Sequence, residues 1–538
     1  MAARGNIVAA WLLVLCLVCS ASAQRATYTN PVIAGDYPDP SVVRVGADYY
    51  ATTTTGAWSP HFPVLHSRDL VNWRVVGHVF DSKPAWVRSD FWAPEITHDR
   101  GRFFVYYTAR RDEGPSRTGT LCVAVATARR PTGPYTDRGP LVCQIPELGN
   151  VGSIDGFFVR DERGRPFLVW KADGNDAEPD QPTSIFAQRL SEDGTKLLGR
   201  RREILRNTEP WERHVVEGSY LLRRGGWFYH FYSGNACCGR GCDYALGVAR
   251  ARRLLGPWEK HPRNPILDDN AGWQCPGHGS IVSTADGRDF LLYHSYRRRP
   301  GTFNVGRETL LDEVKWGADG WPTVNDGRGP SSVAPAPHGV AEADDEAEVF
   351  DDFTTVLPGP AWQSPMFVRL SYYIDAANGG HLVLAPISNP KNDDLAAAVL
   401  ARQPVSGDYT AEVRVVTNGA VARSLNPPTH AGLAAYSWRD AAVGLSVSGG
   451  RLVVWRREGN RRDIVGAHPL PPRPPPFVHL RMTATGGETF RFAFSTDGRE
   501  WTELGGAVDG RHVEGARLAL TAGGGPVRFD WVRIKSSE

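Results

Sequence analysis

The chain has 538 residues, which is enough for two or more domains with a sizeable core. Its net charge of +2 and its 22% of charged residues give no field strong enough to indicate a nucleic-acid partner. The 17 Trp, 57 Gly and only 3 Met are typical of a Gly-rich β protein in which most aromatic rings belong to the core.

The first 23 residues have the pattern of a secretory signal peptide. Arg4 precedes an apolar run from Ile7 to Val18, and Ala21-Ser22-Ala23 supplies the small residues of a cleavage site before Gln24. The run is too short to span a bilayer comfortably, and no later stretch approaches about 20 apolar residues. We therefore expect residues 1–23 to be removed and the mature protein to be soluble, free of membranes and secreted to the extracellular space or cell wall.

One pattern occurs five times along the chain. Each copy starts with an acid or a His, continues through a short strand and a Gly-containing turn, and ends in an aromatic-rich strand. The copies begin at Asp39, Glu95, Asp155, Glu217 and His278, so subtraction gives spacings of 56, 60, 62 and 61 residues. Repeats of this period built from short strands predict the blades of a five-bladed β-propeller, in which each blade buries its faces against its neighbours.

The leading residues of the repeats are the candidate functional residues. If each repeat begins on an innermost strand, these side chains are equivalent by symmetry and meet near one end of the central channel. Three acids, Asp39, Asp155 and Glu217, then share one pocket with His278, while Glu95 either lines this pocket or binds backbone donors. The alternative is that polar residues at strand starts only form turns, which five copies in register disfavour.

Six cysteines follow the signal peptide, and an even number in an oxidising compartment favours disulfides over a zinc site. They are Cys122, Cys143, Cys237, Cys238, Cys242 and Cys275. Cys122 and Cys143 form a natural local pair. The other four allow three connectivities, of which a bond between adjacent Cys237 and Cys238 is the least favoured because of strain. A bond to Cys275 would anchor the loop before the fifth repeat.

The composition changes after the fifth repeat. Residues 324–347 are rich in Gly, Pro, Ala, Ser and acids and have no apolar periodicity, which predicts a linker. From residue 348 to residue 538, many short alternating strands follow one another with almost no helix signal, which favours an antiparallel β-sandwich. The predicted fold is therefore all-β, with a propeller over residues 24–323 and a sandwich over residues 348–538.

Several motifs, which occur in order across about residues 28 to 323, together resemble glycoside hydrolase family 43. They are Gly35-Asp36-Tyr37-Pro38-Asp39-Pro40-Ser41, Phe91-Trp92-Ala93-Pro94-Glu95, Ser153-Ile154-Asp155-Gly156, Val216-Glu217-Gly218 and Gly277-His278-Gly279-Ser280. The later region, with Phe350-Asp351-Asp352-Phe353 and Phe494-Ser495-Thr496-Asp497-Gly498, is similar to the concanavalin-like jelly roll that follows the propeller in β-xylosidase-type members.

The resemblance implies an inverting, exo-acting hydrolase that uses three acids. Asp39 matches the general base, Glu217 the general acid, and Asp155 the acid that orients the proton donor and raises its pKa. In such a reaction one carboxylate activates a water while a carboxylic acid about 6.5 to 9.5 Å away protonates the leaving oxygen. The implied substrates carry terminal β-D-xylosyl or α-L-arabinofuranosyl units of hemicellulose or its oligosaccharides, with galactan or arabinan as alternatives.

Further positions match residues that bind ligands in the family. Trp92 matches an aromatic of the sugar subsite, and Arg307 matches an arginine that bonds sugar hydroxyls. A family aromatic is missing at Thr55-Gly56-Ala57, so we expect Trp58 or a sandwich residue to form that wall. His278 matches a histidine near a metal ion, often calcium on the propeller axis, which would be contacted through water; a buried His without metal is the alternative. The chemistry itself implies no cofactor.

Two other functions are compatible with a propeller of this kind. One is a carbohydrate-binding propeller without catalysis, against which the three intact acids argue. The other is a retaining sucrose or fructan hydrolase, in which the two carboxyls lie only about 5 to 5.5 Å apart. The insert from Cys237 to Cys242 is expected to shape the rim of the site. The sandwich is expected either to bind polysaccharide or to direct a loop into the propeller mouth, and the sequence indicates no oligomeric state.

Overall fold

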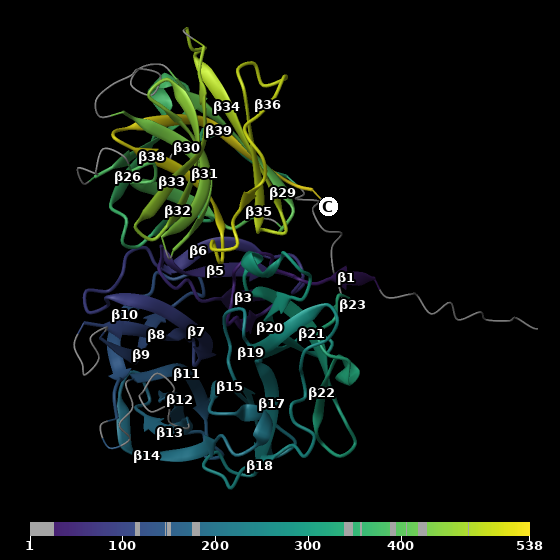
Figure 1. The fold of residues 1–538 in the computed structure, drawn as a ribbon. Helices are drawn as coiled ribbons and strands as arrows, with labels where there is room; N and C mark the ends of the chain where they lie inside the picture. The colour runs from purple at the N-terminus through teal and green to yellow at the C-terminus, as the bar shows by residue number, and fades with distance from the viewer. Residues whose placement is uncertain are drawn as a thin grey trace, which may run out of the picture.

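The computed structural model describes residues 26–112, 119–145, 147, 152–174, 183–337, 348–355, 358–387, 394–404, 406–417, 428–438, 440–471 and 473–537. Within these ranges the regular structure is strand, accompanied by short 3-10 turns. Figure 1 shows two bodies, a propeller from the first part of the chain and a sandwich from the second. No helix in the described ranges is long and apolar enough to cross a membrane. The predicted signal peptide, residues 1–23, lies outside these ranges.

Five antiparallel blades of four strands form the propeller, and a short parallel bridge between Gly152 and Leu121 joins the second and third blades into one eight-stranded sheet. Their innermost strands are β2 (Ser41–Val45), β7 (Ser89–Asp99), β11 (Gly152–Arg160), β15 (Val216–Arg224) and β19 (Trp273–Ser283). Each of these strands contacts the next around a ring that β19 closes on β2. The prediction of a five-bladed propeller is confirmed.

The other strands follow their innermost strand outward in chain order, as the labels β12, β13 and β14 of the third blade show in Figure 1. They are β3 (Asp48–Thr52), β5 (His61–Ser67) and β6 (Arg74–Phe80); β8 (Arg102–Arg111), β9 (Thr120–Ala128) and β10 (Thr136–Val142); β12 (Pro166–Asp173), β13 (Ser184–Leu190) and β14 (Leu197–Arg206); β16 (Trp227–Gly234), β17 (Ala245–Ala251) and β18 (Glu259–Lys260); and β20 (Asp289–Arg297), β21 (Glu308–Trp316) and β22 (Pro322–Val324).

The two ends of the propeller segment are joined by a small sheet. Strand β1 (Thr27–Thr29) pairs antiparallel with β23 (Val333–Pro335). The Asn30 side chain donates to the carbonyl oxygens of Leu311 at 3.0 Å and Ser331 at 3.1 Å. The stretch predicted to be a linker, residues 324–347, therefore includes a strand that joins the end of the propeller segment to its beginning. Sequence periodicity missed it because the strand has three residues and its partner lies at the far end of the propeller segment.

Apolar side chains between neighbouring blades form the propeller core. Phe157 and Val169 of the third blade pack with Phe228 of the fourth, and Trp258 is packed against this cluster. A blade presents apolar side chains on both faces, so it is stable only between two neighbours. Trp258, in the turn that leads to the outer strand of the fourth blade, is thus a packing residue.

The second body is a sandwich of two antiparallel sheets, as predicted. Its larger sheet contains β24 (Glu348–Asp351), β26 (Leu370–Asp375), β27 (His381–Pro386), β29 (Tyr409–Val416), β34 (Phe477–Thr485), β35 (Thr489–Ser495), β36 (Thr502–Glu503), β37 (Val508–Asp509) and β39 (Val527–Ser536). Its smaller sheet contains β28 (Ala398–Arg402), β30 (His430–Ser437), β31 (Ala441–Ser448), β32 (Arg451–Glu458), β33 (Arg461–Pro469) and β38 (Arg517–Gly523). Alternate side chains of both sheets, such as Val413, Leu480, Leu433 and Leu520, face each other in one buried core.

A short pair of strands, one from each body, attaches the sandwich to the propeller. Strand β4 (Trp58–Ser59) of the first blade pairs with β25 (Ser364–Pro365), and in Figure 1 the strands β5 and β6 of this blade lie beneath the sandwich. The Gln403 side chain also donates to the Asp36 carbonyl oxygen at 2.8 Å. Contacts of this kind hold the sandwich over the end of the propeller that carries Asp36.

Trp58 belongs to this interface and not to a sugar-binding wall, which corrects the sequence-based expectation. Its side chain is only 2% exposed. The Arg517 guanidinium lies 4.2 Å from the ring centroid, and the Tyr436 ring meets it edge-on at 6.3 Å. The ring is covered because β4 pairs with a strand of the sandwich, a partner that the local sequence does not reveal.

We expect Trp58→Ala to lower the free energy of unfolding by about 3 to 5 kcal/mol, because it leaves a cavity between the two bodies. Calorimetry should show a lower melting temperature than for Trp438→Ala, a control whose side chain is 40% exposed on the sandwich. If Trp58→Ala melts like the control, the ring does not support the interface.

Candidate active site

The leading residue of nearly every repeat lies at an irregularity of its innermost strand. The register of β7 shifts before Glu95, that of β11 around Asp155, that of β15 directly after Glu217, and that of β19 around His278. A bulge takes a side chain out of the normal alternation and aims it in a new direction. Asp39 and Asp155 each have a φ of 56°, in the left-handed region that Asp adopts more readily than most residues.

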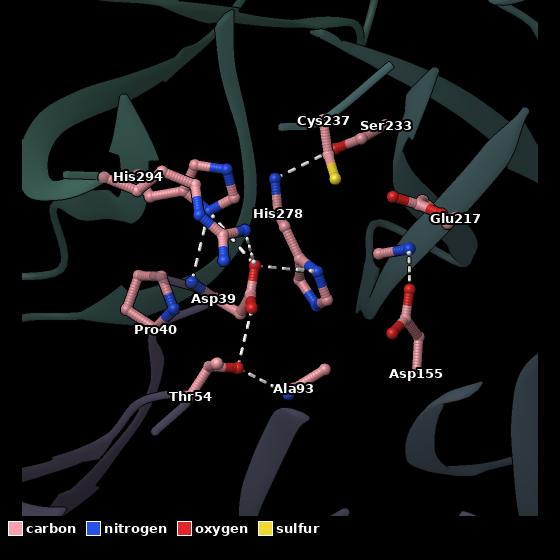
Figure 2. Close-up of polar contacts among 12 residues, drawn as sticks. Asp39, Pro40, Thr54, Ala93, Asp155, Glu217, Ser233, Cys237, His278 and His294 are labelled. Atoms are coloured by element: carbon pink, nitrogen blue, oxygen red, sulfur yellow. Dashed lines mark hydrogen bonds and ion pairs between the residues drawn. The ribbon is translucent and has the colours of Figure 1, made fainter. Parts of the chain in front are cut away.

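These irregularities bring the three predicted acids together around His278. Asp39, Asp155 and Glu217 are only 8%, 7% and 8% exposed. The His278 Nδ1 atom lies 3.5 Å from Asp39 Oδ1, and Gly218 N–H donates to Asp155 Oδ2 at 2.9 Å. Figure 2 shows Asp39 on one side of the His278 ring and Asp155 with Glu217 on the other. The site is thus divided into two halves.

The half that contains Asp39 is rich in hydrogen-bond donors. Thr54 Oγ1 donates to Asp39 Oδ2 at 2.7 Å, and Arg307 Nη1 lies 3.3 Å from Oδ1. His294 Nδ1 accepts the Asp39 backbone N–H at 3.1 Å and lies 3.2 Å from Oδ1. Burial raises the pKa of Asp39, but Arg307, His278 and His294 outweigh it and hold that pKa well below its usual value. Asp39 is therefore ionised and can accept a proton.

The half that contains Glu217 is built around a buried ammonium group. Lys171 Nζ lies 2.6 Å from Glu217 Oε2, and the Tyr244 hydroxyl donates to Oε1 at 2.9 Å. Burial raises the pKa of Glu217, but Lys171, Tyr244 and His278 outweigh it and lower the pKa below its usual value. The sequence-based expectation of a raised pKa for Glu217 is wrong for this arrangement, because the Lys171 ammonium stabilises the ionised form of Glu217.

Asp155 instead carries the raised pKa. Burial and the neighbouring Glu217 carboxylate raise the pKa of Asp155 to about 6, although His278 and Lys171 oppose the shift. The two carboxyls repel each other when both are ionised, so this half of the site takes up a proton as the pH falls through about 6. One half of the site therefore accepts protons while the other can hold one, which is the arrangement that acid–base catalysis needs.

Glu95, the fourth acid of the ring, has a different character. Burial raises its pKa to about 8, and a hydrogen bond with the Ser41 side chain opposes this only in part. Glu95 is therefore mostly uncharged at neutral pH.

Arg307 lies beside Asp39, where its guanidinium can reach a ligand of the same pocket. Its backbone N–H donates to Asp36 Oδ1 at 3.0 Å, which fixes this segment against the start of the first blade. Trp92 lies on β7 and is half-buried, with the Arg110 guanidinium 5.9 Å from its ring centroid. The roles of both residues in sugar binding stay predictions.

Several residues of the site were missed by the sequence analysis. Lys171 gave a visible signal, because it is a charged residue in a strand whose other positions are mostly apolar. Tyr244 and His294 gave none, since an aromatic residue in a β protein is most often part of the core. Thr54 lies in a Thr-rich stretch, and this pattern indicates only a turn.

Three disulfides are formed, which leaves no cysteine of the predicted set for zinc. They are Cys122–Cys143, Cys242–Cys275 and Cys237–Cys238. The first confirms the predicted local pair, and the second anchors the strand β19 that carries His278. The third corrects the expectation that adjacent cysteines do not pair: once Cys242 is bonded to Cys275, Cys237 and Cys238 are left to each other.

The insert that contains Cys237 and Cys238 connects the fourth blade to the sandwich. Arg240 Nη2 donates to Glu488 Oε1 and to Asn304 Oδ1, each at 2.9 Å. Ser233, the cross-strand partner of Glu217, precedes the insert, and Figure 2 shows Cys237 beside Ser233 and above His278. The insert thus stands beside the proton-holding half.

The described residues do not support the predicted calcium site. Within the described ranges, no group of three or more His, Cys, Asp or Glu side chains is gathered in a way that fits a metal ion. His278 instead faces the Asp39 carboxylate.

Both bodies match known families. Residues 28–322 match the family described as Glycosyl hydrolases family 43. Residues 350–535 match the Beta xylosidase C-terminal Concanavalin A-like domain. The two matches thus cover the propeller and the sandwich separately, in the order in which they follow each other in the chain.

Similar proteins include enzymes named for two pentoses. A Xylan 1,3-beta-xylosidase of a Vibrio species is 27% identical over 524 residues, which are 90% of this chain and 91% of that protein. The Xylosidase/arabinosidase 43B of Humicola insolens is 34% identical, but the match spans only 56% of each chain. Among solved structures, the GH43 BlXynB protein of Bacillus licheniformis has a TM-score of 0.78 and 26% identity, and covers 95% of this chain and 100% of its own.

Proposed function

The chain belongs to glycosyl hydrolase family 43, and on this premise we propose that it is a secreted, inverting, exo-acting glycosidase. Its proposed substrates are hemicellulose and its oligosaccharides, from which it releases terminal β-D-xylosyl or α-L-arabinofuranosyl units. The names of the relatives support these two sugars. The observation that carries the proposal is the division of the site into an ionised carboxylate, Asp39, and a proton-holding pair, Asp155 and Glu217.

The two halves fit the two ends of a direct displacement. Asp39 removes a proton from a water molecule as the water oxygen forms a bond to C1 of the sugar. The bond from C1 to the glycosidic oxygen breaks, its electron pair stays on that oxygen, and Glu217 gives the oxygen its proton. The products are a sugar of inverted configuration and a free alcohol. His278 lies between the two carboxyls and so keeps Asp39 out of direct contact with Glu217.

The sandwich favours attack at chain ends because it lies against the segments that lead to the site. Asn304, which lies three residues before Arg307, donates from Nδ2 to the Gly510 carbonyl oxygen of the sandwich at 2.9 Å. A polysaccharide running across the propeller mouth would have to pass this contact. The proposal is tested with a panel of nitrophenyl glycosides together with polymeric xylan and arabinan. We expect the β-xyloside or the α-arabinofuranoside to be cleaved fastest; preferred cleavage of a galactoside would contradict the assignment.

We expect activity to fall as the pH rises through about 6. The raised pKa of Asp155 means that its half of the site holds a proton below this pH and loses it above. Asp155→Asn removes a negative charge next to Glu217, while the positive charge of Lys171 stays beside it. Glu217 then loses its proton at a lower pH. The basic limb of kcat/KM against pH should therefore move down in this variant. A limb that stays in place or moves up would show that Asp155 does not tune the proton donor.

Export is proposed from the signal-like first 23 residues and from the three disulfides, which form in oxidising compartments. Expression of the full chain in a secreting host should release a protein whose first residue is Gln24. Retention of the uncleaved chain inside the cell would contradict this part of the proposal.

A further inference from the structure

Lys171 is a fully buried lysine at the centre of the site. Its side chain is 1% exposed, on a strand, β12, whose residues are all buried. An ammonium group is costly to bury unless it is paired. Here its Nζ atom lies 2.6 Å from Glu217 Oε2 and 3.2 Å from Asp173 Oδ1. Two carboxylates thus compensate the buried charge, and one of them is the predicted proton donor.

The position of Lys171 follows from the blade order. Lys171 is the cross-strand partner of Ile154, the residue before Asp155, so it stands on the edge of the third blade that faces the pocket. Strand β12 also contacts β15, the innermost strand of the fourth blade, which carries Glu217. The Lys171 side chain therefore crosses from one blade to the next, where it contacts Glu217, and its charge also acts on Asp155.

Both oxygens of Glu217 receive hydrogen bonds from groups that act as donors. Lys171 has no acceptor atom, so it can only donate to Oε2. Tyr244 donates to Oε1, and burial together with the Glu217 charge keeps the pKa of Tyr244 well above its usual value, so that it stays protonated. Such surroundings stabilise the carboxylate, which is the form of Glu217 after it has given its proton away. Interactions that strengthen along the reaction lower its barrier.

We propose that Lys171 is a positioning residue for the proton donor: its ammonium stabilises the Glu217 carboxylate as this forms, and so sets the acid strength of Glu217. The inference rests on the proposed function. As the proton passes to the leaving oxygen, the electron pair of the broken O–H bond stays on Glu217 beside Lys171, which keeps its own proton. The negative charge that forms on Glu217 therefore lies beside the positive charge of Lys171.

The other charged and titratable groups around this pair are Asp155 and His278 beside Glu217, and Asp173 and Asp155 beside Lys171. Burial lowers the pKa of Lys171, but the carboxylates of Glu217, Asp173 and Asp155 outweigh it and raise that pKa above its usual value. Lys171 therefore remains charged over the working range of pH. The carboxyl groups are the ones that gain or lose protons in this half of the pocket.

The leaving group of the substrate distinguishes this role from a purely structural one. In Lys171→Met, Glu217 becomes a weaker acid but keeps its proton to a higher pH, so the two proteins are compared well below pH 6, where both hold the proton. There kcat/KM should fall about 100-fold for phenyl glycosides, whose leaving oxygen needs the proton. For dinitrophenyl glycosides, whose leaving group needs little protonation, the loss should stay below about tenfold. Lys171→Arg keeps the charge and should restore most of the activity on both. An equal loss on both substrates would overturn the proposal.

A titration without substrate tests the same inference independently of the proposed function. The Glu217 carboxyl can be followed by carbon NMR in protein labelled at Glu, with Glu217→Gln to assign the signal. Its midpoint should rise in Lys171→Met and stay near that of the unchanged protein in Lys171→Arg and in Lys196→Met, a control at an exposed lysine. If Lys171→Met does not fold, Lys171→Gln, whose amide also donates, replaces it with the same expectation. An unmoved midpoint would overturn the proposal, whereas failure to cleave any glycoside would overturn only the proposed function.

Discussion

Asp39→Ala is expected to abolish hydrolysis of every glycoside, with a loss of at least about 10³-fold whatever the leaving group. Asp39 is the carboxylate that Arg307, His278 and His294 hold in its ionised form, so its removal leaves the attacking water without a proton acceptor. Better leaving groups do not compensate, because the water must lose its proton in each case. The loss is measured as kcat/KM on both a dinitrophenyl glycoside and a disaccharide.

Glu95→Gln is the matched control for this experiment. Glu95 occupies the equivalent position of the second repeat, but its pKa of about 8 leaves it mostly uncharged at neutral pH, so an amide of the same shape changes little. We expect near-normal activity from this variant. If Asp39→Ala still cleaves the activated substrate at a sizeable fraction of the normal rate, Asp39 is not the base.

Glu217→Ala, unlike Asp39→Ala, is expected to lose activity to a degree that depends on the leaving group. Hydrolysis of disaccharides, whose leaving oxygen must be protonated, should fall by about 10² to 10⁴-fold, while dinitrophenyl glycosides should be cleaved at a rate close to normal. Glu217 has this role because it lies in the half of the site that takes up a proton together with Asp155. Rates on a series of aryl glycosides with increasingly good leaving groups measure the difference.

Glu217→Gln separates loss of the proton from loss of contacts. The amide oxygen can still accept a hydrogen bond from Lys171 or Tyr244, but the side chain cannot act as an acid. We expect it to behave like Glu217→Ala on disaccharides and to melt at a higher temperature, because Lys171 keeps a partner. A uniform loss on all substrates in both variants would reject Glu217 as the proton donor.

The ring of blades could be predicted from the sequence because its information is periodic. Asp39, Asp155, Glu217 and His278 recur at nearly constant spacing, and a propeller places equivalent positions around one channel. The structure adds the local cause, a register shift at most of these positions that aims the side chain inward. The identity of the acids could thus be read from the chain.

The features that could not be predicted depend on partners that are distant in sequence. Trp58 looked like a sugar-binding ring, but the strand that covers it begins at Ser364 in the sandwich. Lys171 was visible as a charge in an apolar strand, yet its partner Glu217 belongs to the next blade, and this contact reverses the expected shift in the pKa of Glu217. A local sequence pattern carries no information about contacts between residues that lie this far apart in the chain.

The anomer that is released first tests the two-halved site most directly. Proton NMR during the first minutes of hydrolysis of a β-xyloside, or of an α-arabinofuranoside if that is the better substrate, distinguishes the two configurations of the new sugar before they equilibrate. With Asp39 activating water opposite Glu217, the β-xyloside should yield α-xylose and the α-arabinofuranoside should yield the β-anomer. Initial release of a sugar with the configuration of the substrate would mean that a carboxylate attacks C1 itself, and would contradict the roles assigned to Asp39 and Glu217.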